Sequence, residues 1–295
     1  MAEKPLNFLE EIPFVYGRFR NLMRNKPLPV HIFGTGSSGN SLFLKNLKVL
    51  IDLGLPYSKF SSYDKEFFSK VDYIILTHEH GDHFNPATFV KVLKCFPHVK
   101  FIMSKRMART IVSEQASKLI KQKQKEFTPY VINQTQRFLQ AEERLLTNRN
   151  GKSFSFKPHH TSHGSITNLA VELTCNELNL HLLYASDLDC LEQKEVNRPV
   201  SNHYNFFHVN TTFTTGLPKY ESNPFNIIFL EANYDEEILF EHLRMYPDDI
   251  RAKGNLRHIS EQTAFEYVEH YLSDDGFFIP LHGSKEFGTL IQNFD

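Results

Sequence analysis

A short run of histidine and aspartate residues carries the clearest chemical signal in the sequence. Residues 77–83 read THEHGDH and lie between an apolar, β-branched segment and a predicted helix. His78 and His80 alternate with a period of two, so an extended backbone points both imidazoles in one direction. Asp82 and His83 lie on the turn into the helix, where they can face a second ion beside the first. This spacing of nitrogen and oxygen donors favours a metal site over a polar surface turn that happens to contain three histidines.

Short apolar segments predict the strands and helices that position these donors. Each half of the chain has strands followed by helices, which fits an α/β (α+β) fold: a four-layer αββα sandwich of two mixed β-sheets flanked by helices. The expected strands are 30–34, 41–45, 49–53, 71–77, 99–103, 153–157, 169–174, 180–184, 226–230 and 277–281, and the expected helices are 86–94, 105–126, 235–246 and 261–272. We predict one domain at 30–295, with residues 1–29 as an N-terminal extension that packs on it.

The H-x-H-x-D-H pattern at a strand end resembles the metallo-β-lactamase superfamily, whose members have this layering. The resemblance implies three further ligands in a set order: a histidine after a strand, an aspartate that ends an apolar strand, and a histidine on a late strand. The matching residues are His163, Asp187 and His282. His163 is preferred over His159 and His160 because its Ser-His-Gly context matches best, and Asp189 is the alternative to Asp187.

These donors suit two divalent ions. The expected ligands of one ion are His78, His80 and His163. Those of the other are Asp82, His83 and His282, with Asp82 also a candidate catalytic residue. Asp187 would bridge both ions and leave an open position for a hydroxide. Because no cysteine takes part, zinc is the expected metal, and manganese is the alternative because two carboxylates suit harder ions.

Asp52 ends the apolar run at 49–53 and matches an early aspartate of the superfamily. The resemblance implies that it orients the loop of metal ligands. A turn-capping aspartate is the local alternative.

Two later segments point to phosphodiester chemistry. The segments FLEANYDEE (229–237) and LRHIS (256–260), with the turn SSGN (37–40), resemble the WalJ (YycJ) exonucleases over about residues 30–290. Glu231 and His258 resemble the Glu–His pair that tRNase Z enzymes use near the scissile phosphate. An imidazolium oriented by a carboxylate can protonate a leaving alkoxide, which is worth about 10²–10⁴-fold. The alternatives are a helix-capping neighbour for His258 and a solvated strand end for Glu231.

Two further segments are candidates for substrate contacts. The turn at 34–40 can present backbone N–H groups to an oxyanion, with Ser38 and Asn40 as contacts, or it is simply a tight strand connection. An insertion at about 192–224 is aromatic and unusually long for a connection in a compact domain. Its candidates for base stacking are Tyr204, Phe206 and Phe207. A homodimer contact or a satellite core explains the same rings equally well.

Composition limits the partners. The 295 residues carry 33 basic and 34 acidic side chains, a formal net charge of −1, so no global positive field gathers nucleic acid. No apolar run is long enough to span a membrane, and residues 1–11 lack the apolar core of a secretory signal, so we expect a cytoplasmic protein. Three cysteines without C-x-x-C spacing argue against a disulfide framework.

The predicted function is a binuclear metal-dependent phosphodiesterase that hydrolyses a P–O bond in a nucleotide or nucleic-acid substrate. A metal-activated hydroxide attacks, and His258 is the general acid. The substrate is a cyclic nucleotide, as in the anti-Pycsar phosphodiesterases that share the superfamily fold, or a nucleic-acid end. An ester, thioester or lactam hydrolase is the first alternative, and it leaves His258 and Glu231 without a role. A non-enzymatic nucleotide-binding protein is disfavoured because no expected ligand is missing.

Overall fold

The computed structural model describes residues 30–112, 135–164, 166–189, 216–220 and 222–290. The predicted N-terminal extension, the end of the helix at 105–126 and most of the 192–224 insertion lie outside these residues, as do Tyr204, Phe206 and Phe207. Two compact units form. Among the described residues, the N-terminal unit runs to Pro158 and includes Val171–Leu182, and the C-terminal unit takes in His159–Ala170 and the residues from Leu183 on.

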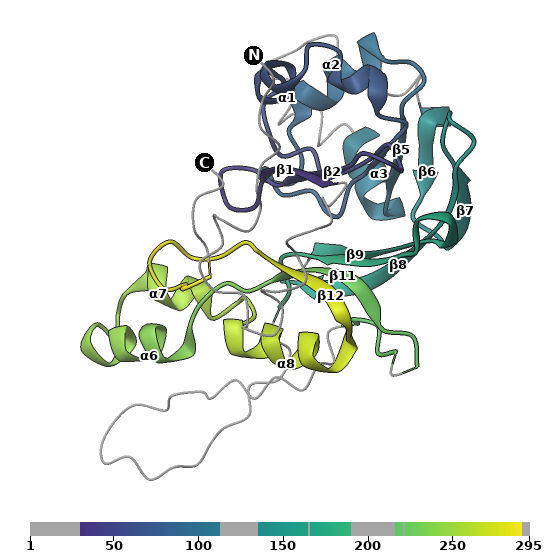
Figure 1. Ribbon diagram of the computed structural model, residues 1–295. Coiled ribbons are helices and arrows are strands. Elements are labelled where there is room, and N and C mark those ends of the chain that lie inside the picture. Colours follow the sequence, from purple (N-terminus) through teal and green to yellow (C-terminus); the bar gives the residue numbers. More distant parts are fainter. Residues whose placement is uncertain (1–29, 113–134, 165, 190–215, 221, 291–295) are drawn as a thin grey trace, which may run out of the picture. The chain divides into compact units, whose positions relative to one another are not determined.

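A six-stranded mixed sheet organises the N-terminal unit (Figure 1). Its strands, in spatial order, are β1 (Val30–Gly34), β2 (Ser41–Leu44), β3 (Val49–Ile51), β4 (Tyr73–Ile75), β5 (Lys100–Met103) and β6 (Phe138–Gln140). The first three strands pair antiparallel, and β3 to β6 pair parallel. Parallel pairing requires crossover connections. These contain α1 (Tyr57–Tyr63), η2 (Phe67–Lys70), α2 (Pro86–Cys95), α3 (Lys105–Val112) and η3 (Thr135–Arg137).

An aromatic core joins these helices to one face of the sheet. Phe60 from α1 and Phe89 from α2 belong to the same buried cluster as Leu50 from β3. The neighbouring residues of β3, Val49 and Ile51, point to the other face and are also fully buried. Burial on both faces is typical of an inner strand in a layered fold. Residues at the ends of such a strand are therefore held in fixed positions by the buried strand.

The second mixed sheet has the strand order β12-β11-β10-β9-β8-β7 (Figure 1). The strands are β7 (Arg144–Thr147), β8 (Ser153–His163), β9 (Ile166–Cys175), β10 (Leu180–Ala185), β11 (Phe225–Glu231) and β12 (Leu272–Leu281). The pair β7/β8 is antiparallel, whereas β11/β12 is parallel. The connections between these strands contain the helices η4 (Asn176–Leu178), α6 (Glu236–Met245), α7 (Ile250–Asn255) and α8 (Glu261–Tyr271).

Helix α8 packs on β11 and β12 in the C-terminal unit. Ala264, Tyr267 and Val268 on one side of the helix belong to the same buried cluster as Ile228 and Phe278 on the strands. Ser260 caps this helix by accepting a hydrogen bond from the Thr263 amide at 3.0 Å. The cap fixes where the helix begins, directly after the residues 256–259 that include His258.

The predicted α+β class is confirmed, since the structure has two mixed sheets with flanking helices. Every predicted element has a counterpart, although only the start of the 105–126 helix lies among the described residues. Strand β8 continues to His163, six residues beyond its expected end, because pairing with its neighbours overrides the weak strand propensity of this polar stretch. The sequence analysis did not predict α1, α7, β6 or β7. No helix among the described residues is long and apolar enough to cross a membrane.

Candidate metal centre

The predicted ligand loop leaves the sheet at the end of β4 and turns directly into α2. The His83 amide donates to the His80 carbonyl at 3.0 Å, which closes the turn. A second bond, from the Leu53 amide to the His83 carbonyl at 2.9 Å, ties the loop to the segment after β3. Asn85 then caps α2 by accepting from the Thr88 amide. Backbone bonds at His80 and His83 and the Asn85 cap therefore hold the end of the loop that leads into α2.

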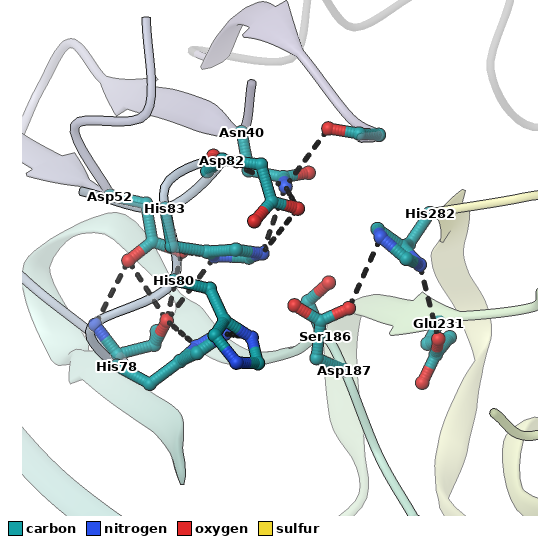
Figure 2. A network of polar contacts seen from close by, with 12 residues as sticks. Asn40, Asp52, His78, His80, Asp82, His83, Ser186, Asp187, Glu231 and His282 are labelled. Atoms are coloured by element: carbon teal, nitrogen blue, oxygen red, sulfur yellow. Dashed lines mark hydrogen bonds and ion pairs between the residues drawn. The ribbon is translucent and has the colours of Figure 1, made fainter. Parts of the chain in front are cut away.

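His78 and His80 turn their ring nitrogens toward each other (Figure 2). Nε2 of His78 lies 3.1 Å from Nδ1 of His80. Two nitrogens bound to one tetrahedral zinc at about 2.0–2.1 Å are roughly 3.3 Å apart, so this spacing fits a shared ion. The other nitrogen of His78, Nδ1, faces the Thr77 hydroxyl at 3.1 Å. Thr77 thereby holds the ring with Nε2 toward His80.

Asp52 contacts the Nδ1 atom of the His83 ring (Figure 2). Its Oδ2 lies 2.6 Å from His83 Nδ1, and Oδ1 accepts from the Thr77 amide and hydroxyl, both at 2.9 Å. The side chains of Asp52 and His83 are fully buried. A carboxylate on Nδ1 fixes the tautomer in which Nε2 carries a lone pair, the form that binds a metal. Nε2 lies 3.7 Å from Asp82 Oδ2.

Asn40 belongs to this cluster. Its amide nitrogen lies 2.8 Å from His83 Nε2 and 3.3 Å from Asp82 Oδ2, and the side chain is almost completely buried. The amides of Gly39 and Asn40 donate to the carbonyls of Gly36 and Asp82. The structure thus places Asn40 against the ligand loop, whereas Ser38 is exposed on the turn.

A second cluster lies in the C-terminal unit. Asp187, Glu231, His258 and His282 each offer one ligand atom, and these four atoms lie within 4.8 Å of one another. His282 Nε2 lies 3.2 Å from Asp187 Oδ1 (Figure 2). Its Nδ1 lies 3.3 Å from Glu231 Oε1. Glu231 thus faces Nδ1 of His282, and the Asn233 amide nitrogen lies 3.3 Å from the same atom.

Glu231 is fully buried and also contacts His258. His258 Nδ1 lies 2.5 Å from Glu231 Oε1, and Oε2 accepts from the Leu188 amide at 2.5 Å. Burial alone would raise the pKa of Glu231, but the charge of His258 and hydrogen bonds from both histidines hold it below its usual range. Burial alone would lower the pKa of His258, but the Glu231 carboxylate raises it above its usual range. The pair therefore favours a protonated imidazole beside a carboxylate.

His163 ends β8 beside this cluster. Its ring centroid lies 5.7 Å from that of His258, and its Nδ1 lies 3.5 Å from Asp189 Oδ1. Asp189 also accepts a hydrogen bond from the Gly164 amide. His159 and His160 lie further back along β8. Asp189 thus contacts His163, and Asp187 contacts His282.

Three of the predicted site residues have a left-handed backbone. They are Asp52 (φ 60°), Asp187 (φ 55°) and His282 (φ 52°). This conformation is strained for residues with a side chain, and such strain concentrates at functional sites. Each carbonyl accepts a hydrogen bond from a buried polar side chain: Ser41 to Asp52 at 2.9 Å, Asn168 to Asp187 at 2.9 Å and Asn233 to His282 at 2.6 Å.

Sequence reasoning missed these three supporting residues. A polar residue within an apolar strand is the signal that would have found Ser41 and Asn168. Asn233 lies in the FLEANYDEE segment that was already singled out for Glu231.

Gly54 was also missed, and it sets how closely the ligand loop approaches the sheet. A Cβ at this position would lie 1.7 Å from the Asp82 carbonyl oxygen. Only glycine leaves room for the loop there, which also lets the Asn40 amide donate to the same carbonyl at 2.6 Å.

The donor chemistry of both clusters fits divalent cations. All predicted ligand atoms are imidazole nitrogens or carboxylate oxygens. Two buried oxygens next to the ligands, Ser186 Oγ and Asn233 Oδ1, have no hydrogen-bond partner among the described residues. Buried polar atoms rarely remain unpaired. These atoms are consistent with a site that a bound polar group completes.

Comparison with known proteins adds evidence on the fold. No family model and no curated protein sequence matches the chain. Among solved structures, the short form of human tRNase Z is similar at 13% identity and a TM-score of 0.54, covering 90% of this chain and 97% of that one. The metallo-β-lactamase fold protein YhfI from Bacillus subtilis is also similar, with 13% identity, a TM-score of 0.47, and coverage of 86% and 85%. A third is MEM-A1, a subclass B3 metallo-β-lactamase from a soil metagenome, with 12% identity, a TM-score of 0.42, and coverage of 82% and 89%.

The similarity to tRNase Z, together with the two mixed sheets, confirms at the level of the fold the resemblance that the histidine motif indicated. The chain has the metallo-β-lactamase fold.

Proposed function

We propose that this protein is a metal-dependent phosphodiesterase that hydrolyses a P–O bond in a nucleotide or nucleic-acid substrate. The observation that carries the proposal is the contact between Glu231 and His258, with 2.5 Å between Oε1 and Nδ1. His258 donates through Nδ1 to the carboxylate, so its other nitrogen is the one that can deliver a proton. This is the arrangement of a general acid with its orienting base.

The predicted metal ligands are seven side chains that the histidine motif and the later matches single out: His78, His80, Asp82, His83, His163, Asp187 and His282. We propose that the seven residues hold two divalent ions, with zinc the first choice and manganese the second. The ions would supply the Lewis acidity that activates a water molecule and neutralises charge on the phosphate.

The chain's own residues have defined tasks in this proposal. Asp52 and Glu231 hold the Nδ1 atoms of His83 and His282, which keeps each Nε2 available as a ligand atom. His258 gives its proton to the leaving oxygen, and Glu231 stabilises the imidazolium before the transfer. A phosphodiester with an alkoxide leaving group needs such an acid, whereas a thioester, which releases a stable thiolate, needs it less. The Glu–His contact therefore supports the phosphodiesterase over a thioester hydrolase.

Leaving-group dependence tests the proposal. Bis-p-nitrophenyl phosphate releases an anion that is stable at neutral pH, whereas cyclic mononucleotides and 5′-labelled DNA release a sugar alkoxide. The variant His258→Gln should lose about 10²–10⁴-fold in kcat on the alkoxide substrates and far less on the nitrophenyl ester. The matched control is His270→Gln, an exposed histidine on α8.

Each outcome has a clear meaning. All hydrolysis should stop after dialysis against EDTA and return with zinc or manganese. Equal losses on both substrate types in His258→Gln would show that His258 is not the acid. A wild-type protein that turns over lactams or thioesters but no phosphodiester would overturn the proposal.

A further inference from the structure

A cavity of about 560 Å³ lies in the N-terminal unit and is not lined by the ligand loop. Its volume is typical of small-molecule sites. Lys45 and Lys48, on the turn between β2 and β3, line it together with Arg149 from the turn between β7 and β8. Lys48 directly precedes β3, whereas Asp52 directly follows it. The cavity is therefore at the other end of this strand from the ligand loop, roughly 13 Å along an extended chain.

The cavity lining is strongly cationic in a chain whose net charge is −1. It contains four basic side chains and a single carboxylate, Asp64. Asp64 is paired with Lys70, and Arg149 is paired with Asp72. Two lining lysines have no carboxylate partner among the described residues: Lys45 and Lys48. An uncompensated pair of cations at a concave surface attracts an anion.

The cations are held by a connected set of turns. Asn148 donates through its amide to the carbonyls of Asn46 and Leu47, both at 3.3 Å, which joins the β7–β8 turn to the β2–β3 turn. Lys48 Nζ donates to Asn150 Oδ1 at 2.8 Å across the same junction. These donors and acceptors are about a hundred residues apart in sequence, with a separation of 102 for Lys48 and Asn150. Lys48 is thus positioned by a tertiary contact, and Lys45 lies on the same turn.

Lys48 also has a left-handed backbone, with φ 57°. Among the described non-glycine residues, the same conformation occurs at Asp52, Asp187, His282 and Asn179, three of which are predicted site residues. A strained backbone at a cavity-lining lysine is consistent with a second functional position.

Aromatic rings complete the lining. Phe43 and Phe67 are buried beside the cavity, and Tyr63 keeps 36% of its surface exposed there. One face of Tyr63 stacks on His31, with 4.0 Å between the ring centroids. An exposed, supported ring next to cations is the combination that binds a base beside its phosphate.

We propose that this cavity binds a nucleoside phosphate, with the phosphate at Lys45 and Lys48 and the base against Tyr63. The occupant is a free nucleotide or one nucleotide unit of a single strand, which share this chemistry. The site needs no metal ion, and it stands independently of the proposed function.

Binding measurements in EDTA test the proposal, because hydrolysis is then suppressed. The probes are a fluorescent oligothymidylate, a free mononucleotide and inorganic phosphate. The double variant Lys45→Ala/Lys48→Ala should weaken nucleotide binding about tenfold or more, since two charge-assisted contacts are lost. The control is Lys59→Ala/Lys94→Ala, which removes two charges from exposed positions on α1 and α2 that do not line the cavity. Urea unfolding of each variant checks that the fold is intact.

The second variant separates base from phosphate. Tyr63→Ala should weaken the oligonucleotide and the mononucleotide roughly 5- to 100-fold, as expected for loss of one stacked base, and leave inorganic phosphate unchanged. Binding of both nucleotide probes supports a free-nucleotide site, and binding of the oligonucleotide alone supports a strand site. No binding by the wild type, or equal affinity in the lysine variant and its control, would overturn the proposal. Turnover of bis-p-nitrophenyl phosphate should be unchanged in Lys45→Ala/Lys48→Ala, which separates this result from a failure of the metal site.

Discussion

The substitution Asp52→Asn separates metal positioning from simple turn capping. Asparagine has the same shape as aspartate and also tolerates a left-handed backbone, here φ 60°, so the backbone should stay in place. The change replaces a carboxylate oxygen with an amide donor. Asp52 accepts from the Thr77 amide and hydroxyl and faces His83 Nδ1, so the new donor must meet another donor or force His83 into its other tautomer.

The size of the effect follows from these contacts. Loss of one buried, charged hydrogen bond costs about 2 kcal/mol of unfolding free energy. The change of tautomer puts the proton on His83 Nε2, the atom needed for a metal. Loss of such a supporting contact typically weakens metal binding by about 10- to 100-fold. We therefore expect both a modest loss of stability and a large loss of zinc affinity.

Competition with a chromophoric chelator measures the zinc affinity, and urea unfolding of the metal-free protein measures the stability. The matched control is Asp72→Asn, because Asp72 is also buried and accepts from the Arg149 amide at 2.6 Å, away from the ligand loop. The control should lose stability and keep its zinc affinity. Equal stability losses with unchanged zinc affinity in Asp52→Asn would refute the reasoning and leave Asp52 as a turn cap.

Three further predictions concern single residues. Asp187→Ala should lose bound metal and hydrolysis together, because Asp187 is the residue proposed to bridge both ions; elemental analysis that still finds two ions per chain would contradict this. Gly54→Ala should destabilise the protein by about 1–3 kcal/mol in urea unfolding and weaken zinc binding, since the new methyl group would lie 1.7 Å from the Asp82 carbonyl oxygen; an unchanged variant would show that the loop shifts freely. Burial, followed by the charge of Lys45, lowers the pKa of His31 to about 4. As the pH falls, the imidazole is therefore protonated in the unfolded chain before it is protonated in the folded protein. The free energy of unfolding should thus decrease between about pH 6.5 and pH 4. His31→Phe should reduce that fall by about 1 kcal/mol, allowing for solvent screening of a half-buried ring, and a parallel pH profile for both proteins would contradict it.

Much of the architecture was predictable because many strands and helices follow from residue patterns within a short stretch of sequence. β-branched runs such as 49–53 and 226–230 gave strands β3 and β11, and the Asn-Pro start of α2 gave its cap and first turn. Short elements such as α7 and β6 were missed. Their segments carry little periodicity, and neighbouring chain segments stabilise them. The polar end of β8 was missed for the same reason.

The sequence by itself determined the donor chemistry of the proposed metal site, because residue types and a period of two are local properties. It placed His78 and His80 on one side of an extended loop, and the structure shows their nitrogens 3.1 Å apart. Only the tertiary structure decided which groups hold those donors. The left-handed turns at Asp187 and His282 depend on amides from Asn168 and Asn233, 19 and 49 residues away. The cationic cavity is likewise invisible in the sequence, because it exists only where two turns from distant segments are hydrogen-bonded together, and no local pattern records a contact between segments far apart in the chain.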